Sequence, residues 1–298
     1  MKPSSIPGGA KMNSSQAGLF QDWHKNGQCP KGTIPIRREQ QDVHPRGSGV
    51  KWIPHRTQLN QSIATDDGNH NEFATVDIEG GIFYGGRAIL NVWNPAVYNG
   101  EFSIAEMWVA AGPDKETNTV EAGWKSDGYK RKGCYNLQCP GFVQVNQKFA
   151  FGSPIEPISR YSAKQFEMGI TIYKKHGNWW LQVQDQVLGY WPSSIFNYLA
   201  STATRIIWGG IGYNSKPNGH HTRTQMGSGH FGNEGFGKAS YFKNIGYMDN
   251  SGKLRDVDAR SLNLQVTRPF CYNVKVANNT VGTDFFFGGP GYSSPCAV

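Results

Sequence analysis

From Phe73 onward, β-branched and aromatic residues gather in short runs that Gly, Asn and Pro separate. Runs of this kind, bounded by turn-forming residues, are typical of β-strands. They cover residues 73–78, 81–93, 102–111, 118–124, 141–146, 166–175, 179–191, 204–213, 239–249 and 262–267. Ten such runs at this spacing predict an all-β protein, either a β-sandwich or a jelly roll.

The connections between the runs contain turn-forming residues. Residues 174–180 (KKHGNWW) and 247–253 (YMDNSGK) resemble hairpin loops, with Asn or Gly where the backbone needs a positive φ. Residues 193–201 (SSIFNYLAS) are the one helix candidate, and no internal repeat recurs at a fixed period. The folded part of the chain is therefore predicted to consist almost entirely of strands.

Residues 1–62 differ from the rest of the 298-residue chain. They show no strand or helix period, contain six prolines, and carry nine Lys or Arg against three acids, which is +6 of the formal net charge of +8. The remaining residues are nearly balanced, with 21 bases and 19 acids. We expect a leader or activation segment at 1–62 and a folded domain at 63–298.

The position of the charge excess also bears on the partners. A nucleic-acid-binding protein keeps its basic residues on a folded surface with interleaved aromatic side chains, whereas here most of the excess lies in the leader. No run of eighteen apolar residues is present in the sequence. We therefore expect no nucleic acid and no membrane among the partners, and no signal peptide within this chain.

The five cysteines indicate an oxidising compartment. Cys134 and Cys139 enclose the short loop YNLQ, and Cys271 and Cys296 bracket the C-terminal segment. Each pair is predicted to form a disulfide, the alternative being unpaired buried thiols in a cytosolic protein. Cys29 is left over, which predicts that its mate lies on a segment missing upstream. Three N-x-S/T sequons agree with a secreted glycoprotein: Asn13, Asn60 and Asn278.

The sequence contains no motif for a catalytic nucleophile or a metal site. G-x-S-x-G is absent, and the eight histidines include no H-E-x-x-H pair, so neither a metal nor another cofactor is expected.

Two glutamates have unusual surroundings. Val120 and Trp124 share one face of the strand expected at 118–124, and Glu121 lies on the opposite face among small residues. Glu234 lies among five glycines in residues 227–237, which indicate sharp turns or close approach of another chain. On residue character alone, two ordinary surface glutamates remain the favoured interpretation.

Longer motifs make Glu121 and Glu234 stronger candidates for a functional role than their residue character alone does. The stretches NTVEAGW, SDGYKRKGCYNLQCPGFVQVN, TRIIWGGIGYNS and HTRTQMGSGHFGNEGFGKASYFKNI resemble the neprosin family of plant glutamic peptidases, in the order of that family. WHKNGQCPKGTIPIRR resembles the end of the family's activation peptide. The resemblance extends from about Trp23 to Cys296. It implies a sandwich of two large antiparallel sheets, an active site on a concave face, and an extended N-terminal pro-segment.

The resemblance also assigns catalytic residues. It implies that Glu121 and Glu234 form the catalytic pair. The family often has proline and a further acid just before the second glutamate, where this chain has Gly232 and Asn233. Glu234 is therefore the only acid at that place.

The same resemblance implies a pairing for every cysteine. It gives the two disulfides as Cys134–Cys139 and Cys271–Cys296. It pairs Cys29 with a propeptide cysteine upstream of this chain. The chain is accordingly expected to be a truncated precursor of a secreted enzyme.

The implied activity is that of an acid-active endopeptidase that cleaves on the C-terminal side of proline. Two carboxyl groups facing one water can hydrolyse a peptide directly, because one takes a proton from the water while the other donates one. Two such groups held close together share one proton and titrate as a unit, which favours activity in acid. Proline packs well against aromatic faces, and the aromatic residues beside the motifs are candidates for its pocket: Trp124, Tyr129, Trp208 and Tyr213.

The expected partners are proline-containing polypeptide substrates and the chain's own N-terminal segment. This segment would occupy the groove of a monomeric enzyme as an inhibitor until acid releases it.

Two alternative functions remain open. A β-sandwich glycoside hydrolase also uses paired carboxylates, although the closely spaced E-x-D-x-E pattern is absent. A non-catalytic cell-wall or carbohydrate-binding protein would explain the aromatic residues and glycines but gives the two glutamates no role.

Overall fold

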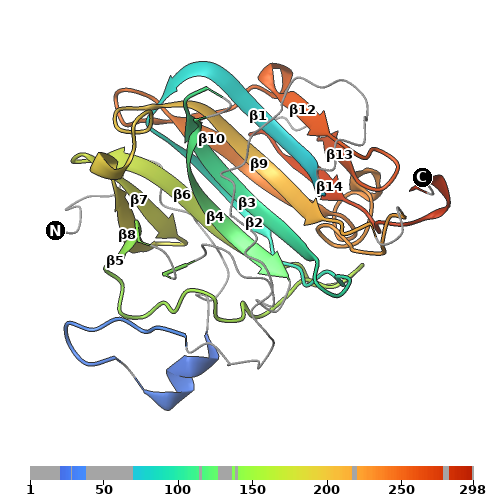
Figure 1. The fold of residues 1–298 in the computed structure, drawn as a ribbon, viewed down its shortest axis with the longest axis horizontal. Helices are drawn as coiled ribbons and strands as arrows, with labels where there is room; N and C mark the ends of the chain where they lie inside the picture. Colours follow the sequence, from blue (N-terminus) through green and yellow to red (C-terminus); the bar gives the residue numbers. More distant parts are fainter. Residues whose placement is uncertain are drawn as a thin grey trace.

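Two antiparallel β-sheets form the protein (Figure 1), as a computed structural model that describes residues 21–27, 29–37, 70–113, 116–126, 136–137, 140–216, 220–277 and 282–296 shows. The five-stranded sheet has the order β12 (Asn263–Val266), β1 (Asn71–Phe83), β9 (Ala203–Tyr213), β3 (Phe102–Ala111) and β4 (Asn118–Ser126). The nine-stranded sheet has the order β13 (Asn273–Val276), β14 (Phe285–Gly288), β10 (Ser240–Met248), β2 (Gly85–Asn91), β6 (Glu167–Lys175), β7 (Asn178–Val183), β8 (Gln186–Pro192) and β5 (Val143–Gln144), with β11 (Leu254–Asp256) paired to β10. The expected all-β sandwich is confirmed.

The main core lies between the two sheets. In β1, Ala74, Val76 and Ile78 point into it, as the period-2 alternation of a strand requires. β2 packs across β3 and β9, and β14 packs across β1 and β9. Trp179 and Trp208 are fully buried in this layer. Each large apolar side chain removed from water in this way stabilises the fold by about 1.5–3 kcal/mol, so the layer contact holds the two sheets in register.

The described elements other than strands are short 3-10 turns, namely η1 (Asp22–Asn26), η2 (Ser193–Ile195), η4 (Gly232–Glu234), η5 (Ala259–Ser261) and η6 (Ser294–Cys296). The prediction of a helix at 193–201 is wrong, because only the short turn η2 forms there. The side chain of Asn118 on β4 accepts hydrogen bonds from the backbone N–H groups of Asn197 and Tyr198, at 3.0 and 2.8 Å. Lys174 donates to the carbonyl oxygen of Ala200. Tertiary contacts have therefore taken the backbone groups that a helix would need.

Tight hairpins connect neighbouring strands of the nine-stranded sheet. His176 and Gly177 form the two-residue loop between β6 and β7, with φ of 49° and 72°, which confirms the hairpin expected in KKHGNWW. A second two-residue loop, Gln184 and Asp185, separates β7 from β8 within the single run expected at 179–191. Gln184 has a φ of 52° there without Gly or Asn in the loop, so the sequence pattern did not reveal this turn.

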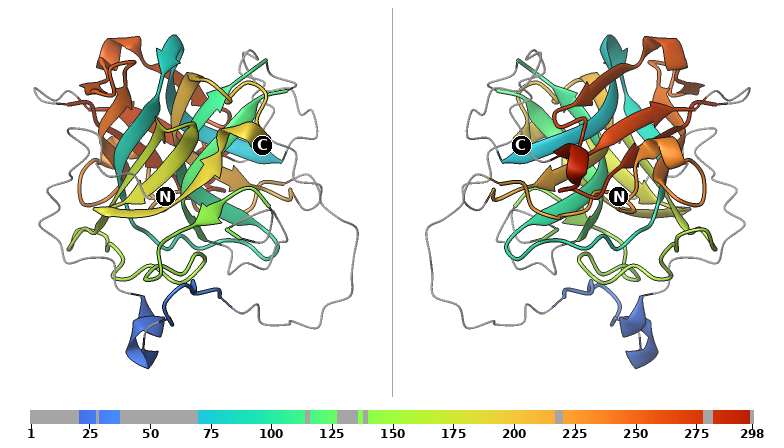
Figure 2. Two further views of the ribbon diagram at one scale, coloured as in Figure 1. Left: turned by 90° about the vertical axis from the view of Figure 1, so that its left-hand side faces the viewer. Right: turned by 90° about the vertical axis from the view of Figure 1, so that its right-hand side faces the viewer.

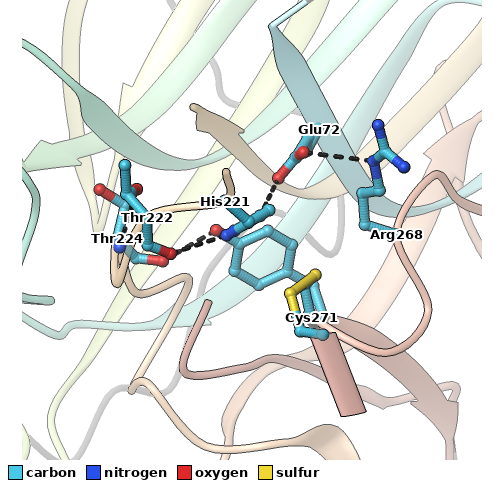
Figure 3. Close-up of a disulfide and its surroundings, with 8 residues drawn as sticks. Glu72, His221, Thr222, Thr224, Arg268 and Cys271 are labelled. Atoms are coloured by element: carbon cyan, nitrogen blue, oxygen red, sulfur yellow. Dashed lines mark hydrogen bonds and ion pairs between the residues drawn. A yellow bond between two sulfur atoms is a disulfide. The ribbon is translucent and has the colours of Figure 1, made fainter. Parts of the chain in front are cut away.

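The C-terminal segment is anchored beside the five-stranded sheet, at the start of β1. Cys271 and Cys296 form the expected disulfide, with their Cα atoms 5.0 Å apart. Close to it, the buried His221 lies 2.7 Å from the Glu72 carboxylate, and Arg268 approaches the same carboxylate at 3.4 Å (Figure 3). Cys134 and Cys139 lie outside the described residues. Cys29 is half-buried and forms no disulfide with any residue that the structure describes.

Loss of the C-terminal disulfide should destabilise the sandwich. The variant Cys271→Ala/Cys296→Ala is expected to lose about 2–4 kcal/mol of unfolding free energy, because the open chain gains entropy when unfolded. Denaturant titration measures the difference. Cys29→Ala is the matched control and should leave the unfolding midpoint unchanged. Equal midpoints for the double variant and the wild type would show that this disulfide does not stabilise the fold.

Candidate active site

Strands β3 and β4 place several polar side chains on one face of the five-stranded sheet. Val120 and Trp124 of β4 are buried in the core, at 1% and 6% exposure, so Glu121 points to the opposite face, as the alternation predicted. In the antiparallel register Trp108 lies opposite Glu121, and Glu106 lies opposite Gly123. Glu106 and Glu121 are therefore diagonal neighbours on one face.

A cavity of about 1190 Å³ surrounds this edge of the sandwich. Its wall includes Glu106 and Glu121, together with residues of β6, β7 and β8 from the other sheet. Because β4 is an edge strand, residues from both of its faces border the cavity. A space of this volume is large enough to hold several residues of a polypeptide or another substrate of similar size.

Burial changes the protonation of both glutamates. It raises the pKa of Glu121 to about 6, while a hydrogen bond from the Thr119 hydroxyl to Glu121 Oε1, 2.6 Å long, acts in the opposite direction. Burial also raises the pKa of Glu106 well above its usual range, the negative charge of Glu121 adds to this, and Lys125 opposes it. The cavity therefore holds two carboxyl groups that retain protons in acid.

Glu234 lies in a different environment. It ends the turn η4, and Gly235 follows with a φ of 73°. Its carboxylate accepts a hydrogen bond from the Tyr161 hydroxyl at 3.1 Å and lies 3.0 Å from His230 Nδ1. The imidazole of His230 packs against the Tyr161 ring, with centroids 4.2 Å apart. The Gly-rich loop thus holds one partly exposed carboxylate between two hydrogen-bond partners.

Glu121 and Glu234 do not meet directly. Within the part of the chain that the structure describes, no hydrogen bond joins their carboxylates, and Glu234 does not line the cavity. A short segment connects the two places: Arg160 and Lys164 line the cavity, while Tyr161 between them binds Glu234. The loop that carries Glu234 consequently contacts the segment 160–165, part of which lines the cavity.

Of the four aromatic residues expected to form a proline pocket, one lines the cavity, two lie elsewhere and one is outside the described residues. Trp124 lines the cavity, and its indole N–H donates to the carbonyl oxygen of Asn91. Trp208 is a core residue with no exposed surface. Tyr213 is at the end of β9, stacked on Phe102. Tyr129 lies outside the described residues.

Other aromatic side chains, which sequence reasoning missed, form one wall of the cavity. Phe142 packs edge-on against Trp191 at 4.6 Å and against Phe151 at 5.2 Å between ring centroids, and Phe149 packs against Phe151 at 5.2 Å. Phe142 belongs to the motif GFVQVN, so its proximity to a recognisable motif was the available signal. The cavity therefore combines a carboxyl-bearing wall with an aromatic wall.

The N-terminal segment contacts the same region. Figure 2 shows residues 21–37 at one end of the sandwich, beside the segment around residue 150. The buried Gln21 side chain exchanges two hydrogen bonds with the Ala150 backbone, of 2.9 and 2.7 Å. Arg37 donates to the Gly152 carbonyl oxygen. Gln21 and Arg37 both line the cavity, so this segment forms part of its wall.

Among the described residues, one group of three side chains could offer ligands to a metal ion. His221, Cys271 and Cys296 offer ligand atoms within 4.8 Å of one another, but the two sulfur atoms are bonded together and are not thiolates. In the same residues no helix has the length and apolar character to cross a bilayer.

The fold and the cavity define an all-β protein with ionisable carboxyl groups at a substrate-sized cavity. The sequence profile of the Neprosin family matches residues 124–290, more than half of the chain, and the chain belongs to that family. Membership is consistent with peptidase activity. Glu234 falls within the matched range, and Glu121 lies three residues before it.

The hydrogen bond from Thr119 provides a test of the electrostatics at Glu121. In Thr119→Val the carboxylate loses a donor to its charged form, so the pKa of Glu121 should rise above about 6. NMR titration of ¹³C-labelled glutamate carboxyls, assigned with Glu121→Gln, measures it. Thr119→Ser retains the hydroxyl and should titrate like the wild type. An unchanged or lowered pKa in Thr119→Val would contradict the contact.

Proposed function

We propose that this protein is a secreted glutamic endopeptidase that is active in acid and cleaves on the C-terminal side of proline. The observation that carries the proposal is the position of Glu121, a carboxyl group with a pKa raised to about 6 in the wall of the cavity. A group of this kind is protonated in mild acid and can donate its proton to a reacting amide. Family membership supports peptide rather than glycan as the substrate.

In the proposed reaction Glu121 is the general acid and Glu234 the general base. Glu234 takes a proton from water, the water oxygen attacks the scissile carbonyl carbon, and Glu121 protonates the leaving nitrogen as the C–N bond breaks. The two protons balance over the cycle, because Glu234 returns its proton to solvent and Glu121 is reprotonated from solvent. No covalent intermediate with the protein is needed.

For Glu121 and Glu234 to act as a pair, the Glu234 carboxylate must reach a substrate that is bound beside Glu121. The support for this is the shared wall: Tyr161, which binds Glu234, is flanked by Arg160 and Lys164 of the cavity lining. Glu234 is only partly covered, with 33% of its side chain exposed, so water can reach it. In this arrangement the scissile bond lies across the rim that residues 160–164 form.

Proline selectivity is assigned to the aromatic wall. The ring of proline is rigid and apolar, and its nitrogen carries no N–H within a chain, so an apolar slot binds it without leaving a donor unpaired. Phe142, Phe151 and Trp191 present such faces and edges in the cavity. Trp124 contributes from the carboxyl-bearing strand β4.

The segment that contains residues 21–37 is proposed to be the end of an activation segment that inhibits the enzyme. It is bound to the backbone of residues 148–152 by Gln21, His24 and Arg37, at the margin of the cavity. Removal of the segment would open that margin to substrate. The proposed domain boundary lies at 62/63, in a stretch outside the described residues, as do the sequons Asn13, Asn60 and Asn278.

Glu121→Gln should abolish peptide hydrolysis, because an amide cannot donate the proton. Digestion of a denatured proteome at about pH 4, followed by mass spectrometry, measures the number and sequence of cuts. The wild type should cut after proline, and its activity should fall as the pH rises through about 6, where Glu121 loses its proton. A β-glucan should remain intact. Undiminished hydrolysis by Glu121→Gln, or β-glucan turnover that needs Glu121, would exclude the proposal.

Gln21→Ala should speed the release of the N-terminal segment. The change removes two hydrogen bonds, each contributing about 0.5–1.5 kcal/mol, so peptidase activity after a shift to acid should appear roughly tenfold sooner. Activity assays at intervals after the shift measure the lag. Thr33→Ala is the control, because the Thr33 hydroxyl bonds only locally to Pro30. An equal lag in Gln21→Ala and the wild type would argue against inhibition by this contact.

A further inference from the structure

Glu106 is a second carboxyl group in the cavity wall that the proposed reaction does not use. It extends from β3, whereas Glu121 extends from β4, and the register makes them diagonal neighbours on one face. Residues in this relation are within reach of each other when their side chains are long. The negative charge of Glu121 acts on Glu106, which agrees with their proximity.

The backbone of β4 leaves no room for a side chain at Gly123. A Cβ built on Gly123 would overlap Cα and Cβ of Glu106 and the carbonyl oxygen of Ala105. β4 therefore needs glycine opposite Glu106. Glu106, Glu121 and Gly123 all line the cavity.

Glu106 is not engaged elsewhere. Among the described residues no hydrogen bond reaches its carboxyl group, whereas Glu121 accepts one from Thr119. The nearest opposing charge is Lys125, whose effect on Glu106 is smaller than that of burial and of Glu121. The remaining charged groups of the cavity wall are Arg37, Glu156, Arg160 and Lys164. Burial thus decides the state of Glu106 and keeps it neutral in acid.

We propose that Glu106 is a positioning residue that stays protonated and donates a hydrogen bond to Glu121. This inference rests on the proposed function. When Glu121 gives its proton to the leaving nitrogen, the Glu121 carboxylate that forms is half-buried in the cavity wall, and a neutral donor beside it stabilises the negative charge. A buried carboxyl group held neutral can act as a donor in this way, and hydrogen bonds to charged groups are stronger than those between neutral groups.

The proposal distinguishes two substitutions of the same residue. Glu106→Gln keeps a neutral donor of similar size and should retain kcat/KM within about threefold. Glu106→Leu removes the donor and should lower kcat/KM at pH 4–5 by about tenfold to a hundredfold, the effect of losing a hydrogen bond to a charged group. The loss should fall on kcat rather than on KM, because the donor acts after Glu121 has given up its proton.

The ionisation of Glu121 gives a readout that does not depend on activity. In Glu106→Leu the Glu121 carboxylate loses a donor and becomes less hydrated, so its titration by ¹³C NMR should move to higher pH. In Glu106→Gln it should stay near that of the wild type. A shift to lower pH in Glu106→Gln would show that Glu106 is normally ionised and repels Glu121, which would overturn the proposal.

The controls separate this inference from the proposed function. Glu79→Leu, an exposed glutamate on β1, should change neither the titration nor the activity. If Glu106→Leu does not fold in a thermal-unfolding assay, Glu106→Ala removes the same donor and gives the same test. An unmoved Glu121 titration in a folded Leu or Ala variant overturns the role of Glu106 and leaves the peptidase intact. Full hydrolysis by Glu121→Gln overturns the peptidase mechanism whatever the titration shows.

Discussion

Removal of carboxyl groups from water is the interaction on which the site depends. An ionised carboxylate loses solvation when it is buried, so the protein environment favours the neutral acid unless a donor or cation compensates. At Glu121 burial outweighs the hydrogen bond from Thr119, and at Glu106 it outweighs the attraction of Lys125. Burial, which is unfavourable for an ionised group in an ordinary core, here yields acids that keep their protons at a higher pH than a free glutamate does, as the proposed reaction requires.

The sandwich produces this burial through three features of its edge. β4 is the last strand of the five-stranded sheet, so its residues border the cavity on both faces. Gly123 brings β3 and β4 together without a side chain between the two carboxyl groups. The aromatic wall comes from Trp191 of β8 in the opposite sheet and from the segments on either side of β5. Glu234 lies outside the cavity lining, in the turn η4, where the Tyr161 hydroxyl binds it and water can reach it.

The architecture and one strand of the site followed from sequence because they depend on local alternation. The burial of Val120 and Trp124 placed Glu121 on the other face, and turn residues such as Gly177 marked a hairpin. Glu106 could not be found in this way, since its relation to Glu121 depends on the register between two strands and not on either strand alone. The aromatic wall was missed for the same reason: Phe142 and Trp191 meet across separate segments. The helix expected at 193–201 failed because Asn118, distant in sequence, binds its backbone.

In the proposed reaction, Glu121 donates its proton to the leaving nitrogen. The most direct measurement follows the pH dependence of kcat for a proline-containing peptide and the ¹³C titration of the Glu121 carboxyl in the same activated protein. If Glu121 is the acid, the pH at which kcat falls to half and the pH at which Glu121 is half ionised should coincide, near pH 6. Hydrolysis that continues undiminished at a pH where Glu121 is fully ionised would contradict it.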